Sequence, residues 1–197
     1  MQHIRTEDII IIDIETVSEQ AGFDKLHDTW KHLWEEKVER QLPEGVTAAE
    51  FYPMRAGIMA EFSKIVCISM GYFTKEPQLR MRVKSFYGHD EKEVLQNFVK
   101  TVNQLEAIHN KWSFTGHNIK EFDIPFLCRR LLINGLNIRD FLNFQNMKPW
   151  ETNMVDTFQY WRFGDYKQYT SLKLLAAALN VPSPKDDIDG SMVGDVY

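Results

Sequence analysis

The stretch IIIIDIET, residues 9–16, places two acids directly after four isoleucines. An apolar, β-branched run of this length is typical of a central strand that is covered on both faces, so we expect it in the middle of a sheet. Side chains alternate along a strand, which puts Asp13 and Glu15 on the same side, about 7 Å apart, and turns Ile14 toward the core. The stretch therefore predicts a central strand that ends in a pair of acids, at the edge where α/β sheets bind ligands.

Segments of strand and helix composition alternate in the rest of the chain. Strand composition occurs at residues 64–73, 79–87, 113–115 and 154–158. The first two of these predict a β-hairpin that turns near Glu76 and Pro77. Apolar and basic residues alternate in its second strand, which predicts that one face of the hairpin is wet. Helical spacing of apolar residues, next to capping residues, occurs at 90–105, 123–134 and 170–180.

Residues 18–59 differ in character from the segments around them. Apolar residues recur there at helical spacing among charges, and Pro43 and Gly45 mark a break. The pattern predicts a helical insertion, residues 18–59, within a single domain, residues 1–197. The order of strands and helices describes an α/β fold, with a central sheet and helices on its faces.

The composition limits the classes of protein that fit. The net charge of −5 and the pI near 5.7 argue against a strongly basic protein that wraps nucleic acid, but an enzyme that grips phosphate through metal ions is compatible with them. Cys67 and Cys128 lie in apolar segments without metal-binding partners nearby, so we expect buried free thiols in a reducing compartment. The N-terminal residues offer no secretory signal and no stretch approaches ~18 apolar residues, which predicts a soluble cytoplasmic protein with no membrane contact.

Asp13 and Glu15 carry the first chemical hypothesis. Like charges this close repel, and they persist as ions most readily when a divalent cation neutralises them. Oxygen-only ligation favours Mg²⁺ or Mn²⁺ over zinc. The alternative is that both acids merely terminate the strand, but acids placed straight after four isoleucines are costly without a partner. We therefore favour a metal site.

Asp123 lies in the segment GHNIKEFDIPFL, residues 116–127. An aspartate before a helix that starts with proline is a good N-cap, which stabilises the helix by ~1 kcal/mol without any chemistry. Asn118 and Phe122 favour a functional role instead, because NIKEFD resembles the second exonuclease motif of the proofreading domains of family-B DNA polymerases. IIIIDIET likewise resembles the first motif of these domains.

The resemblance extends over nearly the whole chain. The insertion, the stretch AEFSKIVCISMGYF, the segment VDTFQYWRF and the late IDGSMVGDVY together resemble a bacterial family of predicted 3′–5′ exonucleases related to the polymerase-B exonuclease domain. The resemblance implies a ribonuclease H-like fold, with a central mixed sheet and helices on both faces. It also implies that four acids hold two metal ions and that nucleotides are removed from a 3′ end.

Carried over by position, the resemblance assigns a role to each of three acids. Asp13 would bridge two Mg²⁺ or Mn²⁺ ions, Glu15 would bind the ion that activates the attacking water, and Asp123 would support the second ion. The residues that would contact the terminal nucleotide are Ile14, Thr16, Asn118 and Phe122. The catalytic and metal-binding set is thus expected to be carboxylates alone.

One part of the family pattern is missing. The family has a third motif on a helix, Tyr-x3-Asp or His-x4-Asp, that supplies the fourth acid. None of the acids after the last expected helix has either spacing; these acids are Asp186, Asp187, Asp189 and Asp195. We therefore expect that the chain is C-terminally truncated. Asp156 could replace the fourth acid, although a local turn or cap is the favoured interpretation.

These observations predict a divalent-metal-dependent 3′–5′ exonuclease that acts on single-stranded nucleic acid, DNA more than RNA, by a two-metal mechanism. The first alternative is an RNA 3′-end trimming exonuclease, since recognition of the 2′-hydroxyl cannot be read from these motifs. The second is a catalytically incomplete nucleic-acid-binding module. Arg129 and Arg130 could contact phosphate, although a solvated helix face is more common for such a pair.

Overall fold

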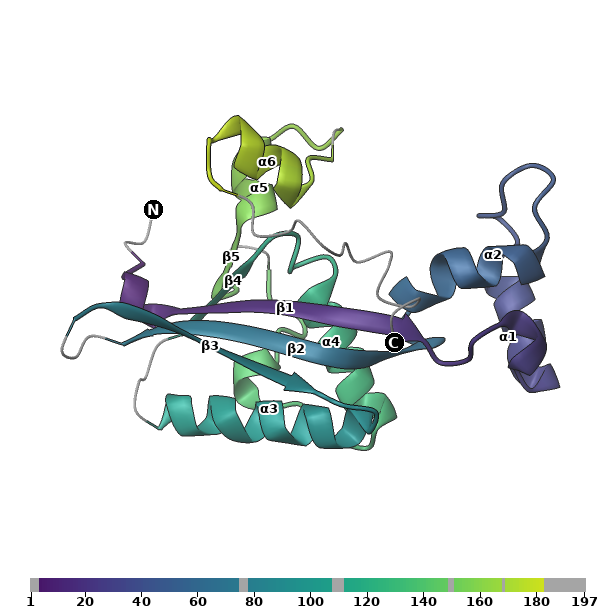
Figure 1. The fold of residues 1–197 in the computed structure, drawn as a ribbon, viewed down its shortest axis with the longest axis horizontal. Coiled ribbons are helices and arrows are strands. Elements are labelled where there is room, and N and C mark those ends of the chain that lie inside the picture. The colour runs from purple at the N-terminus through teal and green to yellow at the C-terminus, as the bar shows by residue number, and fades with distance from the viewer. Residues whose placement is uncertain (1–3, 75–77, 108–111, 149–150, 168, 183–197) are drawn as a thin grey trace.

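The computed structural model describes residues 4–74, 78–107, 112–148, 151–167 and 169–182. Its centre is a five-stranded mixed sheet with the strand order β3-β2-β1-β4-β5 (Figure 1). The strands are β1 (Ile9–Ser18), β2 (Ser63–Thr74), β3 (Arg80–Tyr87), β4 (Ser113–Gly116) and β5 (Met154–Asp156). The β1–β2 and β2–β3 pairs are antiparallel, whereas β1–β4 and β4–β5 are parallel. The predicted α/β fold with a mixed sheet is confirmed, while the turn predicted near Glu76 and Pro77 lies outside the described residues.

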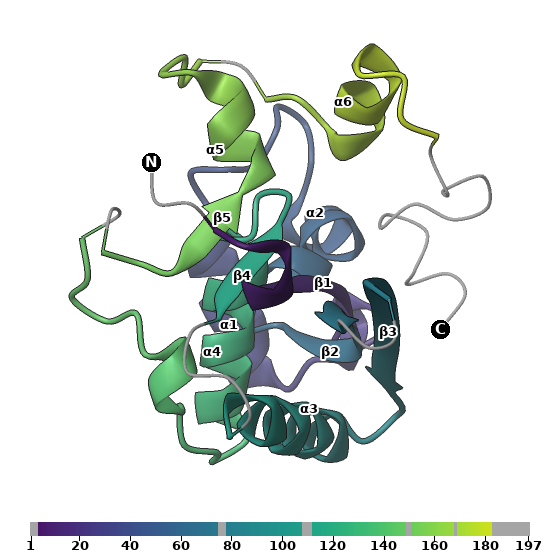
Figure 2. The ribbon, with the colours of Figure 1, turned by 90° about the vertical axis from the view of Figure 1, so that its left-hand side faces the viewer.

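Helices lie on both sides of this sheet. The α-helices are α1 (Asp28–Val38), α2 (Ala48–Arg55), α3 (Glu91–Glu106), α4 (Asp123–Ile133), α5 (Thr157–Arg162) and α6 (Leu172–Ala178). Short 3-10 helices occur at Thr6–Asp8, Phe23–Lys25, Ala56–Ile58 and Asp140–Leu142. α3 and α4 lie on one side of the sheet, α5 and α6 on the other, and α1 and α2 beyond one end of β1 (Figures 1 and 2). None of the helices in the described ranges is long and apolar enough to cross a membrane.

β1 occupies the middle of the sheet, as predicted, but among the described residues only one of its faces is fully covered. Ile10, Ile12 and Ile14 are at most 5% exposed and belong to the main core, which includes residues of α3 and α4. Asp13, on the other face, is exposed. Within the described residues, the prediction that both faces of this strand are covered is therefore wrong. The isoleucine run combines one buried row with a second row that is half-buried.

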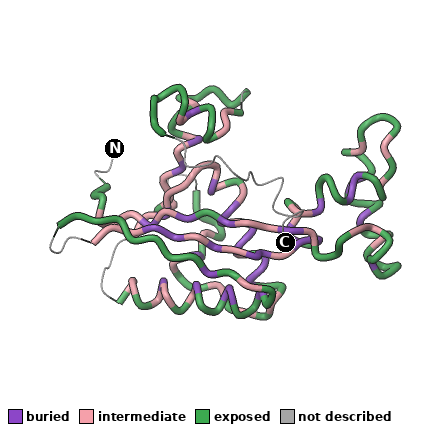
Figure 3. Tube along the Cα trace, in the orientation of Figure 1, coloured by how far each residue is buried: buried purple, intermediate pink, exposed green. Residues whose placement is uncertain are grey.

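The β2–β3 hairpin forms as predicted, but its faces are used differently. Among the β3 side chains only Phe86 is buried, and Figure 3 shows the rest of the strand as mostly exposed. Met81 and Val83 lie on the side away from α3 and are 49% and 66% exposed. Lys84 faces α3, where its ammonium group donates to Thr101 Oγ1 at 3.0 Å. The basic row therefore lies on the helix side, because Phe86 is the β3 residue that reaches the core.

The helices begin and end close to the predicted residues. Asp90 is the N-cap of α3 and accepts the Glu93 N–H at 3.2 Å. α4 ends at Asn134 and Gly135, and Gly135 has the positive φ of 68° that favours glycine after a helix. Ser171 caps α6 by accepting the Leu174 N–H. The predicted strand at 154–158 is shorter than expected, because α5 begins at Thr157.

A buried ion pair joins α3 to α4. Arg130 donates through Nε and Nη2 to the two carboxylate oxygens of Glu91, at 2.8 and 2.5 Å, and both residues are at most 7% exposed. Glu91 also accepts the Ile65 N–H of β2 at 2.7 Å, and Arg130 Nη1 donates to the Ala60 carbonyl at 2.8 Å. Arg130 is thus neither a phosphate contact nor part of a solvated face, and both interpretations of this residue are wrong. Arg129 is exposed.

α1 and α2 build a second, smaller core in the segment for which an insertion is predicted. Trp34 is fully buried there, with T-shaped ring contacts to Tyr52 and Phe62 at centroid distances of 5.0 and 5.1 Å. Thr47 and Glu50 form a reciprocal capping box at the start of α2. These contacts give α1 and α2 their own core beside the sheet, and the insertion itself stays a prediction.

Candidate active site

Asp13 and Glu15 lie on the face of the sheet away from α3. We call this side of β1–β3 the open face; it carries Asp13, Glu15, Cys67, Ser69, Ser85 and Tyr87. β1 continues to Ser18, so the two acids lie in mid-strand and not at its end, contrary to the prediction. The parallel neighbour β4, however, stops at Gly116 beside Ile12. The pair therefore still lies at the carboxyl end of the parallel strands.

The turn after β4 passes very close to β1. A Cβ atom on Gly116 would lie 2.8 Å from the Ile12 carbonyl oxygen and 2.2 Å from Ile119 Cγ2, so only glycine fits. Asn118 follows with a φ of 66°, a left-handed conformation that asparagine tolerates better than most residues. This close approach brings the start of α4 against β1.

Asp123 directs its carboxylate across the site to β1. The N-cap of α4 is Phe122, without a side-chain cap bond, and Asp123 is the first residue of the helix, so the predicted N-cap role of Asp123 is wrong. Its Oδ1 accepts the Ile14 N–H at 3.1 Å. β4 has already ended at this level, so Ile14 finds its hydrogen-bond acceptor on α4. The bond fixes Asp123 against the strand that bears Asp13 and Glu15.

The surroundings of Asp123 disfavour its negative charge. The residue is 4% exposed, and burial, followed by the negative charge of Asp13, raises its pKa from 3.8 to about 7. The N–H groups of Ile14 and of Asp123 itself lower this pKa only in part. Asp156 adds a smaller upward effect. A buried acid held near like charges is the arrangement expected where a cation or a proton is to be bound.

Asp156 is a second buried acid near the same turn, and its surroundings are different. It is 1% exposed and accepts the N–H groups of Asn118, Lys120 and Phe158 at 2.9, 3.0 and 3.0 Å. It is also the N-cap of α5. The favoured interpretation, a local cap, is confirmed. Because both carboxylate oxygens are engaged, Asp156 holds the turn that leads to Asp123.

Asn118 and Phe122 lie at the two ends of this turn. The Asn118 carbonyl accepts the Phe122 N–H at 3.0 Å, while its side-chain Oδ1 is buried without a protein partner. The Phe122 ring contacts Phe126 at 5.4 Å and lies at the rim of the main core. Phe122 thus supports the start of α4, and the buried Asn118 Oδ1 has no hydrogen-bond partner among the described residues. Substrate contact by either residue stays a prediction.

The two β1 residues predicted to meet a nucleotide already have protein partners. The Ile14 N–H is donated to Asp123, and Thr16 Oγ1 donates to the Gly57 carbonyl at 2.6 Å. The Thr16 hydroxyl therefore ties β1 to the end of the insertion. The Ile14 N–H and the Thr16 hydroxyl proton are thus already used within the protein. Contact of either residue with a nucleotide stays a prediction.

The donor set suits a hard divalent cation, but it is not closed. Asp13, Glu15 and Asp123 offer oxygen ligands alone, which Mg²⁺ and Mn²⁺ prefer. The upward effect of Asp13 on the Asp123 pKa shows that the two charges act on one another, and a bound cation would relieve this repulsion. Within the described ranges, no group of three or more His, Cys, Asp or Glu side chains is close enough to hold a metal ion as it stands. The acids Asp186, Asp187, Asp189 and Asp195 and the segment IDGSMVGDVY lie outside the described residues.

The hydroxyl groups beside the acids escaped the sequence analysis. Ser69 lies directly opposite Asp13, and its Oγ is 2.9 Å from Ser85 Oγ on β3. Cys67 lies opposite Glu15, and its Sγ is 3.7 Å from Ser69 Oγ. Burial and the negative charges of Glu15 and Asp13 raise the pKa of this thiol, although its contact with Ser69 lowers it. The sequence CIS, residues 67–69, contained a signal for this row. Cys67 and Ser69 are two residues apart, as are Asp13 and Glu15, so each pair lies on one face of its strand.

Comparison with known proteins gives a family match and similarity to a solved polymerase structure. Residues 58–197 match the family described as predicted 3′–5′ exonucleases related to the exonuclease domain of PolB, a range that includes Asp123 but not Asp13 and Glu15. The chain is similar to the family B DNA polymerase from the hyperthermophilic archaeon Pyrobaculum calidifontis, with 17% identity and a TM-score of 0.52. That match covers 96% of this chain and 20% of the polymerase, so the chain spans about a fifth of its length. No curated protein sequence matches the chain.

Proposed function

Because the chain belongs to the family of predicted 3′–5′ exonucleases related to the exonuclease domain of PolB, we propose that it is a divalent-metal-dependent 3′–5′ exonuclease. Its substrate would be the 3′ end of single-stranded nucleic acid, DNA more than RNA. The observation that carries the proposal is the hydrogen bond from Ile14 N–H to Asp123 Oδ1. This bond places a third, buried carboxylate against the strand that displays Asp13 and Glu15.

The three acids would hold Mg²⁺ or Mn²⁺, with two ions in the complete site. When bound, such ions stabilise the attacking and leaving oxygens of a phosphodiester and lower the pKa of the attacking water. The chain itself contributes the fixed position of the acids. Ile14 orients Asp123, and Asp156 holds the turn before it through the N–H groups of Asn118 and Lys120.

The test is nucleotide release from the 3′ end of a single strand. We expect the protein to release mononucleotides in the presence of Mn²⁺, to stop when EDTA is added, and to lose activity in Asp13→Ala. Asp28→Ala, which removes an exposed acid of α1, is the matched control and should retain full activity. Equal release by wild type and Asp13→Ala would contradict the proposal. Matched DNA and RNA strands decide which nucleic acid is preferred.

A nucleic-acid-binding module without catalysis is a second candidate. It is favoured by the finding that the described residues include no closed group of metal ligands. Binding of a fluorescent single strand without any release of nucleotides, at all Mn²⁺ concentrations, would support it.

A cytoplasmic location fits this proposal. Cys67 and Cys128 are free thiols, although they are half-buried and not fully buried as expected. Free thiols are typical of a reducing compartment. Separation of cell fractions followed by detection of the protein would test the location.

A further inference from the structure

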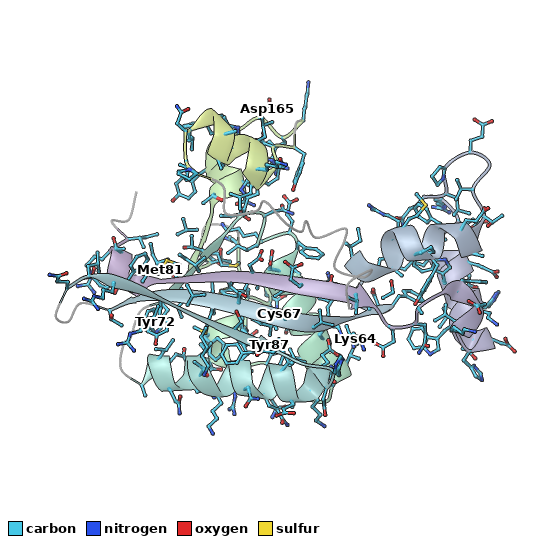
Figure 4. The ribbon with its side chains drawn as sticks, in the orientation of Figure 1. Lys64, Cys67, Tyr72, Met81, Tyr87 and Asp165 are labelled. Atoms are coloured by element: carbon cyan, nitrogen blue, oxygen red, sulfur yellow. The ribbon has the colours of Figure 1, made fainter. Side chains whose placement is uncertain are left out.

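The open face carries a second row of side chains in register with the acids. Glu15 lies opposite Cys67 of β2, and Cys67 lies opposite Tyr87 of β3. Figure 4 labels Cys67 and Tyr87 on their neighbouring strands. Strands in a sheet are ~4.8 Å apart, so Tyr87 and Glu15 lie ~10 Å apart across the sheet. A nucleotide whose phosphate lies at the acids can reach across this distance with its base.

Tyr87 is placed for a ligand and not for the core. Its neighbour Phe86 points to α3 and is 6% exposed, whereas Tyr87 is 78% exposed on the opposite side of β3. An exposed aromatic ring on a rigid strand is a stacking surface for any nucleobase, because every base has a π face. No described helix covers this ring.

Tyr87 also lines a hollow at the edge of the sheet. The hollow has a volume of about 560 Å³ and is lined by residues of β3, of α3 and of the turn between them, and not by Asp13 or Glu15. Lys84 and Lys100 lie in its wall, and two acids, Asp90 and Glu93, lie there as well. Asp90 uses its carboxylate to accept the Glu93 N–H. The two lysines are cations in the wall of this hollow, and Lys84 Nζ also donates to Thr101 Oγ1.

We infer that Tyr87 is the stacking platform for a base near the 3′ end of the bound strand. The single strand of nucleic acid crosses β2 from Asp13 and Glu15 and stacks one base on the Tyr87 ring. It then continues toward the hollow that Lys84 and Lys100 line. The inference rests on the proposed exonuclease function and adds a residue that contacts the substrate. It also predicts a contact that does not distinguish one base from another.

Fluorescence anisotropy of a 5′-labelled single strand, measured with EDTA so that no hydrolysis occurs, tests the inference. Tyr87→Leu should weaken binding about ten-fold and Tyr87→Phe should retain it, because stacking on one ring is worth ~1–3 kcal/mol. Phe163→Leu is the matched control, since Phe163 is a 92% exposed ring after α5. A strand with abasic sites at its 3′ end should bind wild type and Tyr87→Leu equally.

The outcomes separate this inference from the proposed function. Unchanged binding by Tyr87→Leu, equal weakening on the abasic strand, or no measurable binding by wild type would overturn the role of Tyr87. Nucleotide release with Mn²⁺ is measured separately on wild type and Asp13→Ala. Loss of release in Asp13→Ala together with unchanged binding in Tyr87→Leu would retain the exonuclease and reject the platform. Equal nucleotide release by wild type and Asp13→Ala, together with weaker binding by Tyr87→Leu, would retain the stacking role of Tyr87 and reject the exonuclease activity.

Discussion

Asp123 and Asp156 are two buried aspartates that flank the same turn, and the protein treats them differently. Asp156 receives three backbone N–H groups from other residues, which satisfy both of its oxygens. Asp123 receives the Ile14 N–H and faces the negative charge of Asp13, which contributes to its raised pKa. Burial alone therefore does not distinguish a structural acid from a chemical one. The number of donors around the carboxylate, and the sign of the nearest charge, make the distinction.

The largest expected effect is on activity when Asp123 loses its charge. Asp123→Asn keeps an oxygen for the Ile14 N–H but removes the negative charge, so nucleotide release should fall by at least about a hundred-fold. Release from a labelled single strand with Mn²⁺ measures the loss. Asp156→Asn, which changes the other buried acid in the same way, should lose far less activity per folded molecule. Equal losses in the two variants would contradict the comparison.

The second prediction concerns stability. Asp156→Ala leaves three backbone N–H groups without their acceptor, which should lower the free energy of unfolding by about 3 kcal/mol. Urea unfolding followed by circular dichroism measures the change. Asp156→Asn retains one oxygen acceptor and should lie between alanine and wild type. A variant as stable as wild type would show that water replaces the carboxylate.

The third prediction concerns pH in the absence of divalent cations. The folded protein binds the Asp123 proton more tightly than the unfolded chain does, because folding raises this pKa from 3.8 to about 7. The stability that this proton contributes is present below a pH of about 4 and is lost as the pH rises through about 7. Asp123→Asn lacks this loss, so from pH 5 to pH 8 wild type should lose about 2 kcal/mol more than the variant. Parallel pH curves of unfolding free energy would show that Asp123 keeps an ordinary pKa.

The smallest effect is expected at Asn118, in the turn that leads from β4 to Asp123. Its N–H is donated to Asp156, and its φ of 66° suits glycine. Asn118→Gly should therefore change stability by less than about 1 kcal/mol, since it relieves the left-handed conformation. Strand binding should weaken about three- to five-fold if the unpartnered Oδ1 meets the substrate, because one hydrogen bond is worth ~1 kcal/mol. Unchanged binding in the anisotropy measurement would remove Asn118 from the substrate surface.

The elements of the fold followed from local patterns. The isoleucine run placed β1 in the centre, Asp90 marked the start of α3, and Gly135 marked the end of α4. What failed was the assignment of faces. Nothing local to β3 says that its basic row turns toward α3, because that depends on Phe86 reaching the core. The short helix α5 was missed although its cap is local, since Asp156 accepts the Phe158 N–H at 3.0 Å.

The site was harder to predict than the fold, because its decisive contacts join residues far apart in the chain. The spacing of Asp13 and Glu15 was readable from strand alternation, and the opposite orientation of Ile14 is confirmed by its burial. The bond from Ile14 to Asp123 could not be predicted from strand alternation. An acid at the start of a helix has the pattern of a cap, and only the structure shows that its partner is Ile14. The cap role of Asp156 was predicted, but its bonds to the N–H groups of Asn118 and Lys120 needed the structure. In both cases the partner is a backbone N–H, which leaves no signature in the sequence.

The buried pair of Arg130 and Glu91 has a consequence for how this molecule opens. Arg130 also holds the Ala60 carbonyl, and Glu91 holds the Ile65 N–H, so four segments share one ionic centre. If the segment at Ala60 or α4 detached alone, a buried charge would lose a hydrogen-bond partner, which is strongly unfavourable. We therefore expect the segment at Ala60, β2, α3 and α4 to unfold as one cooperative unit, with similar rates of amide exchange.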